Sequence, residues 1–393
     1  MKEFLFRQIK RLIEALLIPF FFLAAFIARF CRKKIDVGLG PEPMINNVYH
    51  KQALSLYGYS VETFVVKANF ITSDYDYDAS RWIRPALLAM LWLGVRSFFR
   101  YRVVYIYFNG GPLSLLNLEC FSLLRCLEPY FYQLAKVKIV VMPYGGDVQN
   151  FSYCPNLLFK QRSAMSSRHF HRRRKIISAC VERWTEHADH VISGCDWVDY
   201  MYYWDTLMVG HFSIELEKFK KYQQQQPEQG DTFRIFHAPN HRAIKGTDLL
   251  VEAVEVLRSE GFKIELQLLE KRPNEEVLKA MAACDLVADQ FIIGWYAMFA
   301  LEAMALGKPV LCYLRQDLID LYTSQKLFSL EECPIINTPF NRIKERIKYC
   351  YEHREEIRQK GLVGPSYVQK THSLEKIGSI FDVINQKIGV KHG

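Results

Sequence analysis

The segment GWYAMFALEAMALGKPV, residues 294–310, carries the pattern that decides the fold. Gly294 permits a tight turn, a helix follows, Gly307 ends that helix, and Pro309 opens a strand. Glu302 lies inside the helix beside two alanines, which let a ligand approach. A carboxylate facing a cleft accepts hydrogen bonds from ribose hydroxyls, as acidic residues do in nucleotide-binding folds. The alternative is a solvent-exposed glutamate on an ordinary helix.

Strands and helices alternate on both sides of this segment, which is typical of a doubly wound parallel sheet. A polar stretch without hydrophobic period, QQQQPEQGD at residues 223–231, divides the pattern into two blocks. Two blocks predict two domains, with ligands bound between them at the carboxyl ends of the strands. We expect strands at 35–39, 61–66, 102–108, 137–142 and 191–193 in the first block, and at 233–236, 264–269, 286–288 and 309–313 in the second.

Within the opening segment, LEAMALGKPV at residues 301–310 resembles the donor-site signature of retaining GT-B glycosyltransferases of family four. The resemblance implies an α/β fold of two Rossmann-like domains facing across a cleft, in which Glu302 binds the ribose of a nucleotide sugar. The family's first glutamate, which touches the donor sugar, stands where this chain has Gly294, and a glycine is typical at Ala297. The donor-binding residues that the resemblance implies are Gly246, Gly294, Tyr296, Ala297 and Met298.

The second motif, HAPNHRAIKGT at residues 237–247, follows a strand and precedes a helix. Backbone N–H groups and the helix dipole therefore point into the predicted cleft. Arg242 and Lys245 add two positive charges, which stabilise the charge that develops on a diphosphate leaving group. An arginine and a lysine before a glycine perform this task in the enzymes that the chain resembles, so both are catalytic candidates. The alternative is a basic surface loop.

The third motif, MPYGGDVQ at residues 142–149, comes directly after a strand and resembles the loop that the family places against donor and acceptor. Asp147 is a catalytic candidate here, with a simple helix cap as the alternative. Tyr144 stands where the family often has a histidine, and a tyrosine is a poor base at neutral pH. We therefore expect the leaving phosphate to take the acceptor's proton. The residues expected on the sugar and acceptor side are Tyr144, Gly145, Gly146 and Asn109, the last from the motif FNGG at 108–111.

The net charge of +9 is concentrated in the first part of the chain. Residues 1–222 hold 29 Lys and Arg against 19 Asp and Glu, a net +10, and the remainder holds 22 against 23, a net −1. Such an excess favours an anionic partner. The ten cysteines form no CxxC pair, which argues against structural zinc and favours a reducing cytosolic compartment. The resemblance implies no metal and no cofactor beyond the nucleotide sugar, which is UDP- or GDP-linked.

Residues 1–34 stand apart in composition. A basic start leads into fourteen apolar residues, 15–28, followed by four cations. Fourteen is short of the ~20 needed to span a bilayer, and Pro19 lies within the run. We expect a membrane-associating helix that lies in the membrane plane or re-enters it, with a true span and a soluble helix as alternatives. The basic cluster Arg172–Lys175 suits an anionic membrane or a polyprenyl-phosphate acceptor, with a solvated helix as alternative; no nucleic-acid motif surrounds it.

These observations predict four segments: 1–34, membrane-associating; 35–222, the acceptor-side domain; 223–370, the nucleotide-sugar domain; and 371–393, a final helix that packs back on the first domain. The predicted function is transfer of a sugar, with retention, from a nucleotide donor to a lipid-linked glycan or glycolipid at the cytoplasmic face of a membrane. A non-catalytic binding protein of this fold, supported by Gly294, Ala297 and Tyr144, is one alternative, and a sugar-nucleotide epimerase is another.

Overall fold

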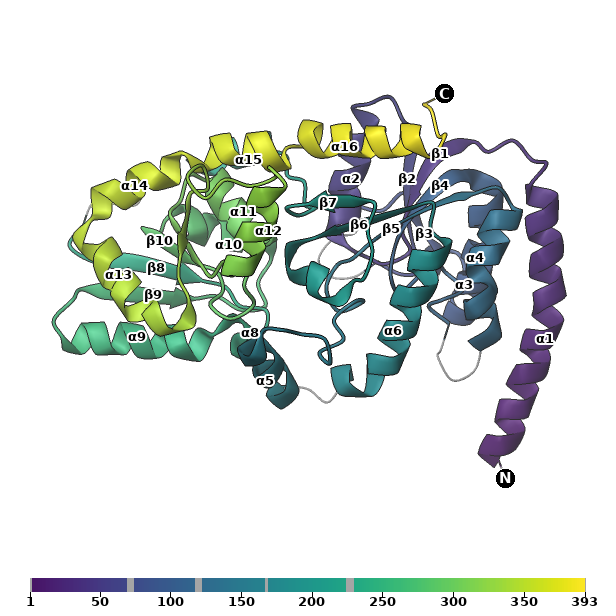
Figure 1. Ribbon diagram of the computed structural model, residues 1–393, viewed down its shortest axis with the longest axis horizontal. Helices are drawn as coiled ribbons and strands as arrows, with labels where there is room; N and C mark the ends of the chain where they lie inside the picture. Colours follow the sequence, from purple (N-terminus) through teal and green to yellow (C-terminus); the bar gives the residue numbers. More distant parts are fainter. Residues whose placement is uncertain (1, 69–73, 117–121, 167–168, 224–229, 393) are drawn as a thin grey trace.

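The computed structural model describes residues 2–68, 74–116, 122–166, 169–223 and 230–392 and contains two parallel sheets (Figure 1). The first sheet has seven strands and the second has five. In spatial order the first consists of β3 (Tyr77–Asp78), β2 (Val61–Val65), β1 (Ile35–Leu39), β4 (Tyr101–Tyr107), β5 (Lys138–Met142), β6 (His190–Gly194) and β7 (Thr206–Met208). The second consists of β12 (Ile335–Asn337), β11 (Val310–Cys312), β10 (Leu286–Ala288), β8 (Phe233–His237) and β9 (Ile264–Leu268).

Helices cover both sheets. The first domain contains α1 (Lys2–Ala28), α2 (Ile45–Ser55), η1 (Ala79–Arg81), α3 (Ala86–Arg100), α4 (Ser122–Leu134), α5 (Leu157–Ser166), α6 (His169–His187), η2 (Cys195–Tyr200) and α7 (Glu217–Gln223). The second domain contains α8 (Arg242–Lys245), α9 (Thr247–Ser259), α10 (Asn274–Ala282), α11 (Met298–Ala305), α12 (Gln316–Ser324), η3 (Phe340–Arg342), α13 (Ile343–Glu352), α14 (Arg354–Leu362) and α15 (Gly364–His372). The last helix is α16 (Leu374–Lys387).

The expected alternation of strands and helices is confirmed, and each expected strand lies within one residue of its predicted bounds. The sequence analysis missed β3, β7 and β12, which have only two or three residues and therefore show no period. Of the predicted linker 223–231, residues 224–229 lie outside the described part of the chain.

The N-terminal helix belongs to the first domain, which corrects the boundary at residue 34. Helix α1 continues through Pro19 and packs on α3 and α4. Phe21, Ala25 and Ala28 are fully buried, and the Phe21 ring stacks on Phe131 with centroids 5.7 Å apart. Deleting residues 1–34 would therefore expose the core of the first domain. No helix among the described residues is long and apolar enough to cross a membrane.

The C-terminal helix α16 crosses from the second domain to the first and packs on α2 (Figure 1). Two hydrogen bonds hold it there. The Tyr59 hydroxyl donates to Asp382 Oδ1 (2.8 Å), and the buried Tyr105 hydroxyl donates to Asn385 Oδ1 (2.9 Å). The chain thus leaves the first domain after α7 and returns to it at its end.

Candidate functional site

The topology marks one place in each sheet where a ligand is expected. Successive strands are added in opposite directions from β1 and β4 in the first sheet, and from β8 and β10 in the second. In doubly wound folds this reversal leaves a crevice at the carboxyl ends of the two strands. The loops after β8 and β10 carry Lys245 and Asp289, and those after β1 and β4 carry Glu42 and Asn109.

Lys245 lies at the reversal point of the second sheet. Its Nζ donates to the fully buried Asp289 at 2.5 Å, while its own side chain is 17% exposed. The same Nζ lies 6.0 Å from the centre of the Phe299 ring, in the first turn of α11. Gly246 follows with φ of 78°, a left-handed conformation that joins α8 to α9. An ammonium has three donors, so Lys245 can bond a phosphate and keep Asp289.

A buried histidine, His237, connects the elements at this reversal point. It had no predicted role of its own. His237 bonds the carbonyl oxygen of Ala288 through Nδ1 (2.7 Å) and the hydroxyl of Thr247 through Nε2 (2.9 Å). It therefore joins the ends of β8 and β10 to the start of α9. Burial lowers the pKa of His237 to about 4, so the imidazole is neutral at pH 7.

Arg242 does not join Lys245. Its guanidinium forms a two-point ion pair with Glu270, at 3.0 and 2.9 Å, on the exposed side of α8. A bidentate pair fixes the plane of the guanidinium and turns two of its five N–H donors toward Glu270. The expected pairing of Arg242 with Lys245 on one diphosphate is therefore not supported.

Glu302 lies on α11 of the second domain. Its side chain is nearly buried, and its Oε1 accepts a hydrogen bond from Asn274 at 3.2 Å. Burial raises the pKa of Glu302 to about 7. Burial and the carboxyls of Glu302 and Glu215 also raise the pKa of Tyr49 to about 12. Tyr49 lies on α2 of the first domain.

The N-terminal end of α11 is open to an anion. Ala297 precedes the helix in an extended conformation, and no side chain caps this end. Ala297 and Met298 are both partly exposed. Uncapped N–H groups at a helix N-terminus favour negative charge. These backbone groups lie on the same turn as Phe299, and hence close to Lys245.

In the first domain, four side chains meet at the reversal point between β1 and β4. Asn109 Nδ2 donates to Glu42 Oε1 at 2.7 Å and to the Tyr144 hydroxyl at 2.8 Å. Arg173 Nη2 donates to Asn109 Oδ1 at 3.3 Å. Burial raises the pKa of Glu42, although Asn109 and Arg173 oppose the shift. The sequence analysis missed Glu42, whose signal is its position two residues after Gly40 at a strand end.

Arg173 therefore faces this cluster, although the sequence analysis assigned it to a membrane-facing patch. Lys175 is exposed, and the side chain of Arg172 lies outside the described residues. Gly145 has φ of 124° and is buried, while Gly146 is partly exposed beside it. Tyr144 and Asn109 are thus in contact, and Gly146 lies two residues after Tyr144; their place on the sugar and acceptor side stays a prediction.

Asp147 is buried away from any substrate, which corrects its assignment as a catalytic residue. It has no exposed surface, and its carboxylate accepts backbone N–H bonds from Phe108 (3.0 Å), Tyr144 (3.0 Å) and Gly145 (2.9 Å). Burial raises the pKa of Asp147 to about 7 despite these bonds. Asp147 joins the loops after β4 and β5, and so positions Asn109 and Tyr144.

Similar architectures occur among solved structures. Sucrose-phosphate synthase from Thermosynechococcus elongatus is 13% identical with a TM-score of 0.57; the match covers 91% of this chain and 99% of that one. An alpha-glucosyltransferase in complex with UDP-glucose and DNA containing an abasic site is 13% identical with a TM-score of 0.53, covering 89% and 99%. The HepE protein of Anabaena in complex with UDP-glucose is 12% identical with a TM-score of 0.50, covering 89% and 99%.

The chain has the GT-B fold. No protein-family model matches its sequence, and no curated protein matches it. At these identities the likeness extends to the fold, so the site must be argued from this chain's own residues.

One departure from the expected GT-B donor site has a direct structural cause. Gly294 has φ of 104°, and a Cβ built there would lie 2.6 Å from Cδ of Arg315. The Arg315 stem thus occupies the space in which a glutamate at position 294 would begin. Its guanidinium bonds Asp199 of the first domain at 2.5 and 3.0 Å, and also Asp317. This nearly buried pair joins the two domains, and the sequence analysis missed it.

Replacing Gly294 with alanine should therefore destabilise the protein by about 2–4 kcal/mol, since it combines an unfavourable φ with overpacking. Gly261→Ala is the matched control, because Gly261 has φ of 92° and its Cβ would meet nothing within 4 Å. The control should lose about 1–2 kcal/mol, the cost of the backbone conformation alone. Chemical denaturation measures both variants. Equal losses would mean that Arg315 moves aside without cost.

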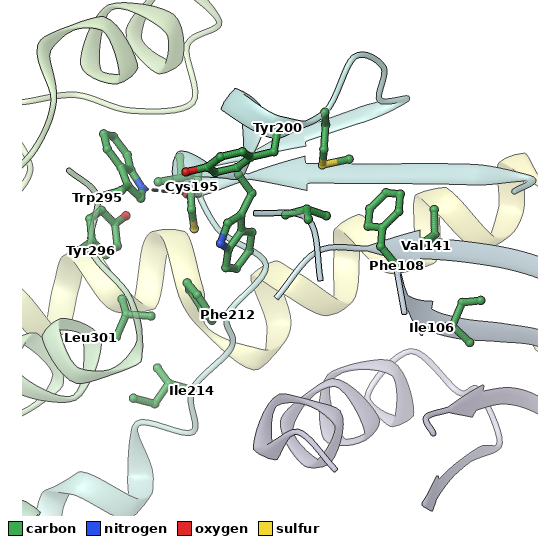
Figure 2. Close-up of a cluster of buried hydrophobic side chains, with 14 of the residues drawn as sticks. Ile106, Phe108, Val141, Cys195, Tyr200, Phe212, Ile214, Trp295, Tyr296 and Leu301 are labelled. Carbon is green, nitrogen blue, oxygen red and sulfur yellow. Dashed lines mark hydrogen bonds between the residues drawn. The ribbon is translucent and has the colours of Figure 1, made fainter. Parts of the chain in front are cut away.

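Tyr296 does not face a ligand, contrary to the expected donor-binding role. It is 1% exposed, and its hydroxyl bonds Tyr367 and His372, both at 2.9 Å. Figure 2 shows it beside Trp295 and Leu301, opposite Cys195, Phe212 and Ile214 of the first domain. Trp295 Nε1 donates to the Val209 carbonyl across this boundary at 3.0 Å. The core is therefore continuous between the domains, and Tyr296 contributes to packing.

A cavity of about 620 Å³ lies in the first domain beside the loop after β5. Its lining includes three tyrosines and three carboxylates: Tyr153, Tyr200, Tyr202, Glu182, Glu186 and Asp199. No lysine or arginine lines it, so it suits a neutral, hydroxyl-bearing group better than a phosphate. Among the described residues, no group of three or more His, Cys, Asp or Glu is arranged to bind a metal ion.

Proposed function

We propose that this protein transfers a sugar from a UDP- or GDP-linked donor to an acceptor carried on a membrane, with retention and without a metal. The observation that carries the proposal is that a polar group lies at the reversal point of each sheet. Lys245 and the open end of α11 lie at one point, and Glu42, Asn109, Tyr144 and Arg173 lie at the other. This arrangement suits a diphosphate at the first and hydroxyls at the second.

In this proposal Lys245 and the first-turn N–H groups of α11 bind the diphosphate and stabilise the charge that grows on it as the glycosidic bond breaks. Glu302 accepts hydrogen bonds from the ribose. Glu42 accepts one from a hydroxyl of the sugar or the acceptor, while Tyr144 and Asn109 position that hydroxyl. The acceptor's proton passes to the departing phosphate, because burial raises the pKa of Tyr144 far above neutrality and disqualifies it as a base.

The test uses the purified full-length chain with each UDP- and GDP-sugar, after a thermal-shift screen for binding. A donor at 100 times its Kd stabilises a protein by about 2.7 kcal/mol. Release of nucleoside diphosphate is then followed with and without a detergent extract of membrane lipids. Release that requires the extract supports the proposal. Epimerised donor without an extract, or binding without turnover, would instead identify an epimerase or a binding protein.

Donor binding should depend on pH through Glu302. Its pKa is raised to about 7 by burial, so the carboxylate that accepts two ribose hydroxyls predominates only above neutrality. Affinity for UDP-glucose should therefore rise up to about tenfold from pH 6 to pH 8. This ligand carries no group that titrates in that range. Glu302→Gln should bind more weakly at pH 8 and lose the pH dependence in calorimetry; a parallel rise in the variant would place the titrating group elsewhere.

The membrane part of the proposal rests on the outward face of α1. Leu12, Leu16, Phe20, Leu23, Ile27 and Phe30 recur at helical spacing and are each 48% or more exposed. A contiguous row of large exposed apolar side chains is typical of an interaction surface. We propose that this face lies in the cytoplasmic leaflet, where it brings the site to a lipid-borne acceptor.

Replacing both Leu16 and Leu23 with serine should lower binding to lipid vesicles by about 100-fold or more, since each leucine contributes at least about 1.5 kcal/mol on burial. Co-sedimentation measures the loss. The matched control is Leu362→Ser with Val363→Ser, which are 52% and 50% exposed at the far side of the second domain. The control should bind as the wild type does. Equal loss in both would mean that the leucines of α1 have no special role.

A further inference from the structure

Beside α1, a second group of large apolar side chains is exposed on the first domain. Trp82, Leu87, Leu88 and Trp92 are 78, 40, 53 and 47% exposed. They lie on α3 and on the turn that precedes it. The opposite face of α3 is buried, because Ala89, Leu93 and Phe98 lie in the core. The apolar residues at the surface therefore exceed what α3 needs for its own packing.

Helix α3 lies beside α1 in the first domain. The two helices pack against each other, with Phe21 of α1 6.3 Å from Phe98 of α3, ring centre to ring centre. Figure 1 places both at the end of the molecule farthest from the second domain. Both groups of exposed apolar side chains therefore belong to neighbouring helices at the same end of the molecule.

Two segments at this end of the molecule carry cations and no carboxylates. Residues 15–35 and 79–107 contain no Asp or Glu. Arg29, Arg32, Lys34 and Arg84 are exposed there, and Arg81 is exposed with Asp78 3.8 Å from its Nε. Tryptophan beside arginine is the composition found at the boundary between lipid headgroups and acyl chains. An anionic bilayer satisfies the cations and the apolar residues together.

We infer that Trp82, Leu87, Leu88 and Trp92 insert into the headgroup region of an anionic bilayer, so that α1 and α3 dock together. The inference deepens the membrane part of the proposed function and rests on it. Two helices in one plane fix the orientation of the first domain, which a single helix leaves free to roll. The cluster of Glu42 and Asn109 is then held at a constant height above the lipid.

Tryptophan fluorescence tests this contact directly. Of the six tryptophans, Trp184, Trp197 and Trp295 are buried and Trp204 is half-buried, so Trp82 and Trp92 are the exposed ones. The full-length protein is mixed with vesicles of phosphatidylcholine and phosphatidylglycerol, with or without bromine on the acyl chains. Bromine quenches only tryptophans at the membrane, so emission should fall with brominated lipid. Trp82→Phe with Trp92→Phe should abolish the quenching while the protein still sediments with the vesicles.

A second variant measures the contribution to binding. Trp82→Ser with Leu88→Ser should lower the vesicle partition coefficient by about tenfold or more per side chain. The unfolding midpoint should stay at the wild-type value, because both side chains are exposed. A shifted midpoint would show that this face packs against protein, and would overturn the inference.

The remaining outcomes separate this inference from the proposal on which it rests. Sedimentation with vesicles but no quenching overturns the contact through α3 and leaves α1 as the anchor. No sedimentation overturns both. A dimer in analytical ultracentrifugation that Trp82→Ser dissociates, without vesicle binding, assigns the surface to a second copy of the chain and overturns the inference.

Discussion

Lys245→Ala should lose about 10²–10³ in kcat, the usual effect of removing one electrostatic contact to a developing charge. Lys245 lies where the second sheet reverses direction, next to the first turn of α11. Among the described residues, the other cation of this motif, Arg242, is engaged with Glu270 in a two-point pair. KM should change less than kcat, because the charge on the leaving phosphate is greatest in the transition state.

The same substitution should also destabilise the fold, which the sequence pattern did not predict. Asp289 is fully buried, and removal of Lys245 leaves its charge unpaired, at a cost of about 3–5 kcal/mol. The control is Lys245→Met combined with Asp289→Asn, which removes both charges. It should recover most of the stability in a urea titration while turnover stays low. A double variant with about a third or more of wild-type kcat would remove Lys245 from the reaction.

Asp147→Ala should destabilise the protein by about 3 kcal/mol or more, because three buried backbone N–H groups lose their acceptor and each costs about 1–3 kcal/mol. Asp147→Asn keeps one carbonyl oxygen. Its free energy of unfolding should therefore lie between those of Asp147→Ala and the wild type. Turnover should also fall, because the loops that carry Asn109 and Tyr144 are then no longer joined.

Asp248→Ala is the matched control for Asp147. Asp248 also forms an ion pair, with Arg162 at 2.6 Å, but its side chain is 54% exposed. Its loss should cost about 1 kcal/mol or less. Urea unfolding measures all three variants. If Asp147→Ala folds with wild-type stability but loses turnover, Asp147 acts in the reaction after all, and the assignment of a positioning role is wrong.

The glycine turns identified from the sequence lie between elements of the fold, as predicted. Gly246 joins one helix to the next at a positive φ. Gly145 has a positive φ in the turn after β5. Such turns depend on residues adjacent in the chain, so the sequence reveals them. The orientation of a charged side chain depends instead on partners that are distant in sequence. The partners of Arg242 and Asp147 were therefore not foreseen, since Glu270 and the N–H group of Phe108 lie 28 and 39 positions away.

By itself the sequence determined the two α/β domains and the position of the switch loops, because hydrophobic period and turn residues act over a few neighbouring positions. Only the tertiary structure decided three further points. It placed α1 in the core of the first domain, where Phe21 packs on Phe131. It filled the space beside Gly294 with Arg315 and joined the domains through Asp199. It exposed Trp82 and Trp92 beside the outward face of α1. Each depends on which surfaces remain uncovered after long-range packing, and no local pattern encodes that.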